Sequence, residues 1–293
     1  MARLAGGGIA LAIMGALVLT PDALFMRWSG MDGPQMLAWR GLCMGAVFVS
    51  AWALSSTGLR RDLVAMGAPA ALLILPSQIV NAGLFPVGIA AAPVSVVLLG
   101  VATVPVWSAG LAWAVYGERA GRATWVTIAV VLVALGFAVF EPDSALQFKA
   151  ILGVVCGLAV AAALAVNFVI LRHNPEVPLL LAIGLGAFCA GIIGLLVTGP
   201  GQMTQGVLPA ILLTALVILP LSFFLLSQAS RHTAAANVSL LLLLETVLGP
   251  LWVWLGTGEA PTWRMLTGGA VVIIALAAFL LHERRRTTSQ DLA

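Results

Sequence analysis

The sequence has few charged residues. Only 9% of its 293 residues are Asp, Glu, Lys or Arg, whereas about a quarter of a typical soluble domain is charged. Hydrophobic residues make up 61% of the chain, and the mean hydropathy is +1.10. This composition excludes an ordinary soluble domain and indicates an integral membrane protein. The chain also lacks a Lys/Arg tract interleaved with aromatic residues, which argues against nucleic acid as a partner.

Cysteines and catalytic motifs are scarce as well. The three cysteines, Cys43, Cys156 and Cys189, lie inside apolar runs without metal-ligand spacing, so we interpret them as small packing residues. The chain has no H-E-x-x-H, G-x-S-x-G or Walker motif. These absences argue against an enzyme, and we expect neither a metal nor a cofactor.

Long apolar runs dominate the rest of the sequence. About 20 apolar residues cross the hydrocarbon core of a bilayer as a helix, and ten runs approach or exceed that length. We therefore predict an all-α membrane protein with ten transmembrane helices, at 6–25, 35–54, 63–87, 91–116, 124–140, 150–171, 178–197, 207–228, 235–256 and 264–281.

The distribution of basic residues predicts the topology, because Lys and Arg collect in cytoplasmic connections. If the N-terminus is inside, three basic residues lie outside, namely Arg27, Lys149 and Arg264. Ten then lie in the cytoplasm: Arg3, Arg60, Arg61, Arg119, Arg122, Arg172, Arg231, Arg284, Arg285 and Arg286. Both termini are therefore predicted to be cytoplasmic, in a multi-pass protein of the inner (plasma) membrane.

Three short sequence motifs of the first half of the chain occur again, in the same order, in the second half. Val94-Ser95, Gly117-Glu118 and Thr124-Trp125 return as Val238-Ser239, Gly258-Glu259 and Thr262-Trp263. Five spans in each half give the halves opposite orientations, so we predict two inverted five-helix repeats, at 1–145 and 146–293. Inverted halves can open a central cavity to each side in turn, which is typical of a carrier.

These features resemble the drug/metabolite transporter superfamily, in particular its paired EamA-type domains. The resemblance rests on the ten spans, the two Gly-Glu turns with Trp125 and Trp263 after them, and Arg40 early in the second span. It implies a central cavity lined by spans one, three, four, six, eight and nine, with the fifth and tenth spans at the periphery. Bacterial exporters of aromatic amino acids are the kind of member that we would compare first.

Two charged residues are predicted at the same depth in neighbouring antiparallel spans, Asp22 in the first and Arg40 in the second. Charged groups inside a membrane usually pair with each other or face a cavity. The pair has two compatible interpretations, a structural ion pair and an outer gate that opens during the transport cycle.

Glu245 lies near the middle of the ninth span. A carboxyl group at that depth favours its neutral form, which would suit a proton-coupled carrier. The alternative is a protonated carboxyl that holds helices together by hydrogen bonds.

Polar residues in the other predicted lining spans indicate a binding site near the midplane. Gln78 and Asn81 are three residues apart and share one face of the third span. The remaining candidates for substrate contact are Thr103, Trp107, Asn167, Ser222 and Trp252. Ordinary hydrogen bonding between helices, or packed and lipid-facing tryptophans, would explain the same residues. Separately, Gly41 with Gly45 and Gly153 with Gly157 are spaced for close helix contact.

Taken together, the sequence predicts a secondary transporter that exports small amphipathic metabolites, with aromatic or hydrophobic amino acids as the first expectation. The direction of transport comes from the resemblance alone. A passive facilitator (uniporter) or a multidrug exporter of the same fold remains as an alternative, and a channel or a membrane enzyme fits less well. The expected partners are a small-molecule substrate and the lipid bilayer.

Overall fold

The computed structural model describes all residues except 1, 93, 140–147, 259–262 and 292–293. The described part of the chain consists of helices and their connections, without a β-strand. The helices of the first half are α1 (Ala2–Leu19), α2 (Asp22–Ser29), α3 (Gly33–Ser55), α4 (Leu59–Ala65), α5 (Pro69–Ala91), α6 (Val94–Val101), α7 (Val104–Tyr116) and α8 (Arg122–Val139).

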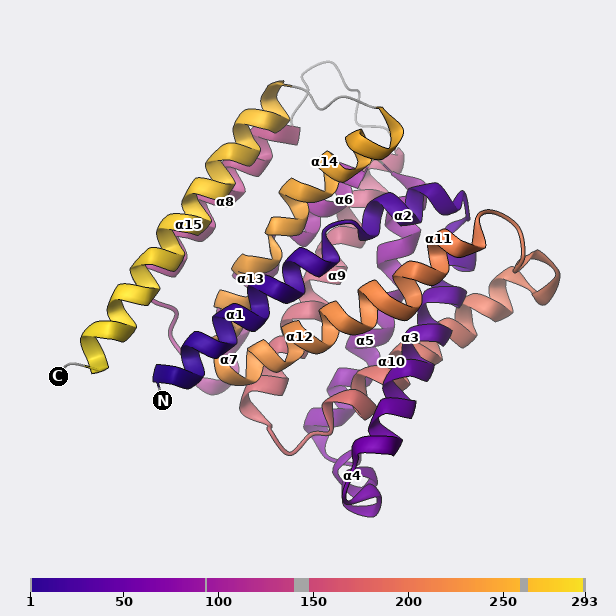
Figure 1. Cartoon of the computed structure of the whole chain (residues 1–293), viewed down its shortest axis with the longest axis horizontal. Helices are drawn as coiled ribbons and strands as arrows, with labels where there is room; N and C mark the ends of the chain where they lie inside the picture. Colours follow the sequence, from indigo (N-terminus) through magenta and orange to yellow (C-terminus); the bar gives the residue numbers. More distant parts are fainter. Residues whose placement is uncertain (1, 93, 140–147, 259–262, 292–293) are drawn as a thin grey trace.

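The second half begins with two long helices. Its elements are α9 (Phe148–His173), α10 (Leu179–Thr198), the short 3-10 helix η1 (Pro200–Gln202), α11 (Leu208–Leu213), the π-helical turn η2 (Thr214–Ile218), α12 (Leu219–His232), α13 (Ala235–Leu242), α14 (Leu244–Thr257) and α15 (Trp263–Asp291). The start of α1 and the end of α15 lie at the same end of the molecule (Figure 1).

Eight helical stretches of the described chain are long and apolar enough to cross a membrane. They match the predicted spans one to four and six to nine to within a few residues, and they run over 7–29, 33–55, 69–91, 94–116, 151–173, 179–198, 208–232 and 235–257. Large apolar side chains also point outward, such as Leu54 at 89% and Val133 at 74% exposure. The protein is therefore a multi-pass membrane protein built from helices.

The two remaining predicted spans correspond to shorter apolar helical stretches, at 122–137 and 266–282. These belong to α8 and α15, which pack against each other at one edge of the bundle (Figure 1). Apolar residues of both helices form a buried cluster together with Leu240, Leu243 and Val247 of the ninth predicted span. The pair is thus attached to the bundle through a hydrophobic contact.

Glycines allow the bundle to pack closely. A Cβ atom built on Gly41 of α3 would lie 2.5 Å from the Cα atom of Gly191 in α10, which is closer than side chains approach backbone. Gly157 of α9 faces Gly100 of α6 in a similar way. The predicted small-residue faces are therefore real helix contacts, and in lipid such contacts are a main source of helix association.

Three of the apolar stretches are interrupted, whereas the sequence predicts each of them as one continuous span. Pro21 separates α1 from α2, because it has no N–H to continue the helix, and the N–H and hydroxyl of Thr20 both bind the carbonyl of Leu17. The other two interruptions separate α6 from α7 at Thr103 and α13 from α14 at Leu243.

The α6–α7 and α13–α14 segments are built alike. Each has an eight-residue helix, an interruption, and then a helix of 13 residues in α7 and 14 in α14. Each ends on a glycine in the left-handed conformation, Gly117 at φ 69° and Gly258 at φ 78°, which other residues rarely adopt. Glu259 and Thr262 of the second motif lie outside the described residues, so the motif can be compared only up to Gly258.

Candidate functional site

The interruptions place two acidic side chains at the starts of helices. Asp22 is the first residue of α2, and Glu245 is the second residue of α14. The N-terminus of a helix carries a partial positive charge that favours a carboxylate nearby. The two helices pack against each other, and both side chains line the same internal cavity.

Asp22 and Arg40 form an ion pair with two contacts. Arg40 Nη1 lies 2.7 Å from Asp22 Oδ1, and Nη2 lies 2.8 Å from Oδ2. The Asp22 side chain is fully buried, and that of Arg40 is 7% exposed. Two parallel, charge-assisted hydrogen bonds of this kind hold a guanidinium and a carboxylate in a defined geometry.

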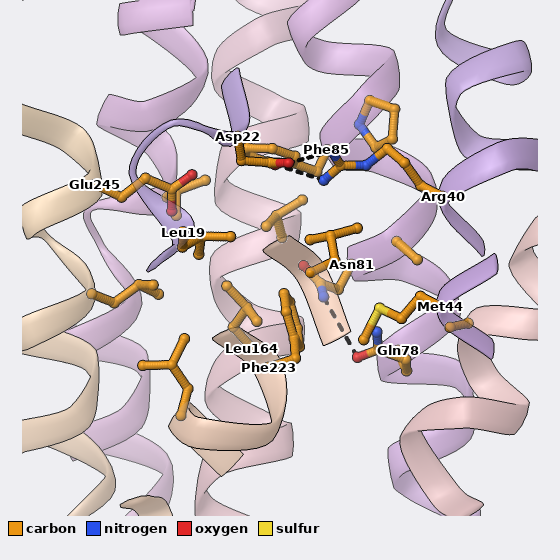
Figure 2. A pocket seen from close by; sticks show the side chains of 18 of the residues that line it. Leu19, Asp22, Arg40, Met44, Gln78, Asn81, Phe85, Leu164, Phe223 and Glu245 are labelled. Carbon is orange, nitrogen blue, oxygen red and sulfur yellow. Dashed lines mark hydrogen bonds and ion pairs between the residues drawn. The ribbon is translucent and has the colours of Figure 1, made fainter. Parts of the chain in front are cut away.

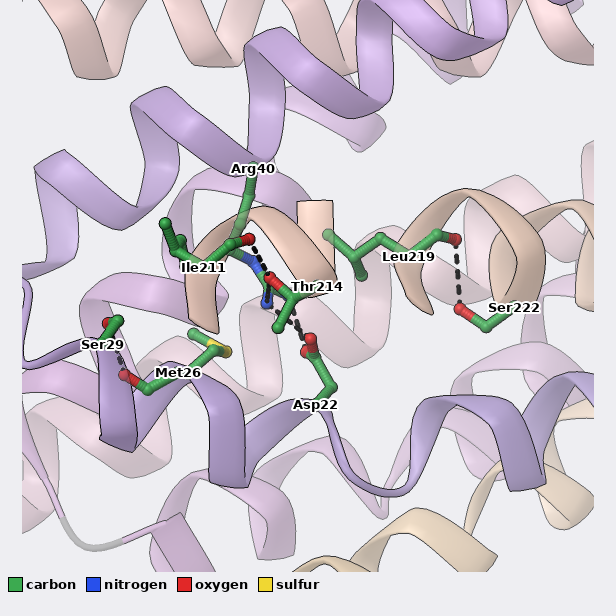
Figure 3. A network of polar contacts seen from close by, with 8 residues as sticks. All are labelled: Asp22, Met26, Ser29, Arg40, Ile211, Thr214, Leu219 and Ser222. Atoms are coloured by element: carbon green, nitrogen blue, oxygen red, sulfur yellow. Dashed lines mark hydrogen bonds and ion pairs between the residues drawn. The ribbon is translucent and has the colours of Figure 1, made fainter. Parts of the chain in front are cut away.

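The ion pair also connects to the second half of the chain (Figure 3). Arg40 Nη1 lies 3.4 Å from the hydroxyl oxygen of Thr214, and that hydroxyl donates to the carbonyl of Ile211. Thr214 is the first residue of the π-helical turn η2. π-Helical turns are rare and often occur at functional sites. The sequence does not indicate Thr214, because no motif marks a π-helical turn.

Glu245 faces this ion pair across the cavity (Figure 2). Its side chain is 3% exposed, and its Oε1 atom has no hydrogen-bond partner among the described residues. A buried polar atom without a partner is costly, and such atoms usually mark a place where a water, an ion or a ligand binds. The cavity is therefore lined by three ionisable side chains, of which Asp22 and Arg40 are paired with each other.

The amides of α5 line another part of the cavity (Figure 2). Gln78 Oε1 accepts a hydrogen bond of 2.9 Å from Asn167 Nδ2, and it lies 3.5 Å from Asn81 Nδ2. Asn167 Oδ1 in turn accepts from the hydroxyl of Ser77. Asn167 itself is not part of the lining, so its place is behind Gln78, where it orients the amide.

Apolar side chains supply most of the remaining lining. They come from both halves of the chain and include three aromatic rings, those of Phe85, Phe168 and Phe223. Arg40 also lies over the ring of Phe85, 5.9 Å from its centre. A largely apolar cavity with a few converging polar groups is the usual form of a small-molecule binding site.

Besides Asn167, four of the residues predicted to contact substrate lie outside this cavity lining. Thr103 binds the carbonyl of Gly100 at the end of α6, and Ser222 binds the carbonyl of Leu219 in its own helix (Figure 3). Both hydroxyls are satisfied by the backbone. Neither side chain is part of the lining of this cavity.

The two tryptophans are also elsewhere. Trp107 is 48% exposed and Trp252 is 42% exposed, so both are largely on the outside of the bundle. Trp252 Nε1 donates to the hydroxyl of Thr20, beside the interruption between α1 and α2. Helical rotation decides which face a side chain occupies, and the apolar sequence around these residues does not reveal it.

The fold is similar to that of a solved protein. A crystal structure aligns with a TM-score of 0.73 over 95% of this chain and 97% of the other chain, at 16% sequence identity. No protein-family model and no curated protein matches the sequence. At this identity the match supports the arrangement of the helices alone.

Proposed function

We propose that the protein is a secondary carrier of small amphipathic metabolites, and that the internal cavity is its substrate site. The observation that carries this proposal is the buried Oε1 atom of Glu245, which has no partner among the described residues and faces the Asp22–Arg40 pair in a largely apolar cavity. A purely structural carboxyl group would be expected to have its hydrogen bonds satisfied within the protein.

The proposed architecture is that of ten spans in two inverted five-helix halves. The α8 and α15 stretches would provide the fifth and tenth spans. The likeness of the α6–α7 and α13–α14 segments supports the repeat, since interrupted helices in corresponding positions are typical of inverted-repeat carriers. The basic connections support cytoplasmic termini in an inner membrane, and membership of the drug/metabolite transporter superfamily is part of the same proposal.

The charges of the cavity suit an amino acid. The carboxylate of a zwitterionic substrate would compete with Asp22 for Arg40, and its ammonium group would neutralise Glu245. The amides of Gln78 and Asn81 would bind polar groups of the substrate, while the phenyl rings would pack against an apolar side chain. This assignment favours aromatic and hydrophobic amino acids over nucleosides, which carry no carboxylate.

Movement of the ion pair would connect binding to transport. Arg40 of α3 pairs with Asp22 of α2 in the first half and lies 3.4 Å from Thr214 of η2 in the second half, so this one side chain contacts both halves. A substrate carboxylate that displaces Asp22 would allow Arg40 to move, and its contact with Thr214 of the second half would then change. Protonation of Glu245 would remove a charge from the cavity and so would couple the return step to a proton.

The test is counterflow in liposomes with the purified full-length protein. A carrier shows saturable uptake that is accelerated by substrate on the opposite side, whereas a channel does not, and an enzyme shows no flux. A panel of amino acids, nucleosides and cationic drugs would identify the substrate class. Counterflow of cationic drugs without amino acids would favour the multidrug alternative, and saturable flux that no gradient can drive uphill would favour a passive facilitator.

Variants can show whether transport depends on the residues that line the cavity. We expect Gln78→Ala and Asn81→Ala to reduce transport by about tenfold, because each loses a polar contact to the substrate. Ser222→Ala and Thr103→Val are matched controls, since both change a polar residue outside the cavity lining, and they should transport nearly as wild type. Glu245→Gln should abolish any dependence of flux on the proton gradient. Equal losses in the controls, or proton dependence that survives Glu245→Gln, would contradict these assignments.

A further inference from the structure

A second cavity lies where α7 ends and where α8 and α13 begin. Unlike the central cavity, it is lined by small and polar residues rather than by large apolar side chains. The lining residues that matter here are Glu118, Arg119, Thr124, Ala235, Ala236 and Asn237. These positions are at the ends of predicted spans, at the depth of lipid headgroups rather than of hydrocarbon.

Two helix N-termini meet at this cavity. α13 has eight residues, and its N-cap residue, Ala234, provides no side-chain hydrogen bond. The first amide of this helix with a backbone partner is that of Asn237, which binds the carbonyl of Ala234. The N–H groups of Ala235 and Ala236 are therefore free to bind a ligand, and the start of α8 adds a second positive helix end.

Two buried polar side chains line the same space without a partner. Asn237 is 8% exposed and Thr124 is 4% exposed. Within the described part of the chain, neither side chain makes a hydrogen bond, although both line the cavity. Their polar atoms are not among the fully buried atoms that lack a partner, so they are accessible from the cavity and are available to bind a polar ligand there.

The charges around the cavity favour an anion. Arg119 is exposed and forms no ion pair with any described residue. Glu118 is the acidic residue of the lining, but Arg172 Nε lies 3.0 Å from its Oε2 atom and His173 Nε2 also lies 3.0 Å from it. The charge of Glu118 is thus offset by Arg172, which leaves Arg119 and the two helix N-termini to attract a negative group.

We propose that this cavity is a binding site for a phosphate group. The free N–H groups of α13, the amide of Asn237 and the hydroxyl of Thr124 would donate to its oxygens, and Arg119 would supply the opposite charge. The phosphate has two sources, the headgroup of an anionic phospholipid and a soluble phosphate. The site is separate from the central cavity, and this inference does not depend on the proposed transport activity.

The test measures binding to the full-length protein in neutral detergent. One arm titrates phosphatidylglycerol, with phosphatidylcholine as the neutral comparison, and counts bound lipid by native mass spectrometry. The other arm measures thermal stability with inorganic phosphate against chloride at equal ionic strength. Binding in the first arm alone identifies a lipid headgroup, and binding in the second arm identifies a soluble phosphate.

Variants test whether binding depends on the residues that line this cavity. Arg119→Gln should weaken binding by about tenfold or more, because it removes a charge-assisted contact, and Asn237→Ala should weaken it by about fivefold. Arg122→Gln is the matched control, since it makes the same change in the same connection but outside the cavity lining. If neither probe binds, or if Arg122→Gln weakens binding as much as Arg119→Gln does, the proposal is overturned.

Discussion

The ion pair between Asp22 and Arg40 provides the sharpest stability prediction. Asp22→Asn keeps the size of the side chain but removes its charge, so Arg40 is left charged and buried without its partner. Removal of one partner from a buried ion pair costs about 3–5 kcal/mol, because the remaining charge is no longer compensated. The two contacts of 2.7 and 2.8 Å and the almost complete burial of both side chains place this pair in that class. A loss of that size lowers the folding equilibrium constant by more than about a hundredfold.

The measurement is equilibrium unfolding of the purified protein by SDS in mixed micelles, followed by tryptophan fluorescence. Glu176→Gln is the matched control, because it also neutralises one carboxylate but at an exposed position, and it should change the free energy of unfolding by less than about 0.5 kcal/mol. The double variant Asp22→Asn with Arg40→Gln should lose about 1–3 kcal/mol less than the sum of the two single losses. The reasoning fails if Asp22→Asn is as stable as wild type, or if the two single losses simply add.

Two further predictions concern stability at a helix contact and in a connection. Gly41→Ala should destabilise the protein by about 1–3 kcal/mol through overpacking against α10, whereas Gly110→Ala, whose new Cβ atom meets no atom within 4 Å, should be nearly neutral; equal stabilities in thermal unfolding would contradict the close contact. In the connection before α5, hydrogen bonds from Ser56 and then Trp52 lower the pKa of Asp62 below its usual value. The ionised form of Asp62 therefore stabilises the fold above about pH 4 and loses this contribution as the pH falls through its lowered pKa. Asp62→Asn should accordingly be less stable than wild type at pH 7, and the difference should shrink at pH 3; a difference that does not change with pH would exclude this role.

Local composition was sufficient for much of the fold and for part of the cavity. Long apolar runs can bury their backbone polar groups in a bilayer only as helices, which is why eight of the predicted spans match helices in the structure. Charged and amide side chains are costly in hydrocarbon, so the same reasoning directed attention to Asp22, Arg40, Gln78 and Glu245. All four line one cavity.

Some polar side chains within the spans need no polar surroundings. A hydroxyl such as that of Thr103 or Ser222 can bind a carbonyl one turn earlier in its own helix, and it then needs no polar environment. A tryptophan in an apolar run is equally compatible with lipid, a helix contact or a cavity. The sequence around Trp107 and Trp252 contains no signal that distinguishes these surroundings.

Only some of the interruptions in the helices can be predicted from the local sequence. Pro21 and Pro105 could have indicated the first two, because each removes an N–H from a helix. The interruption at Leu243 has no proline beside it, and the π-helical turn at Thr214 has no marker at all. These features depend on packing between helices that are distant in the sequence.

The sequence by itself determined that the chain lies in a membrane as a set of apolar helices, and it determined which side chains are too polar to face lipid. Those are properties of composition and of single residues in hydrocarbon, so they need no knowledge of neighbours. Only the tertiary structure decided which polar groups meet, which of them is left without a partner, and where a second polar cavity opens between helix ends. Such outcomes depend on the rotation and contact of helices from both halves of the chain, and no local pattern encodes them.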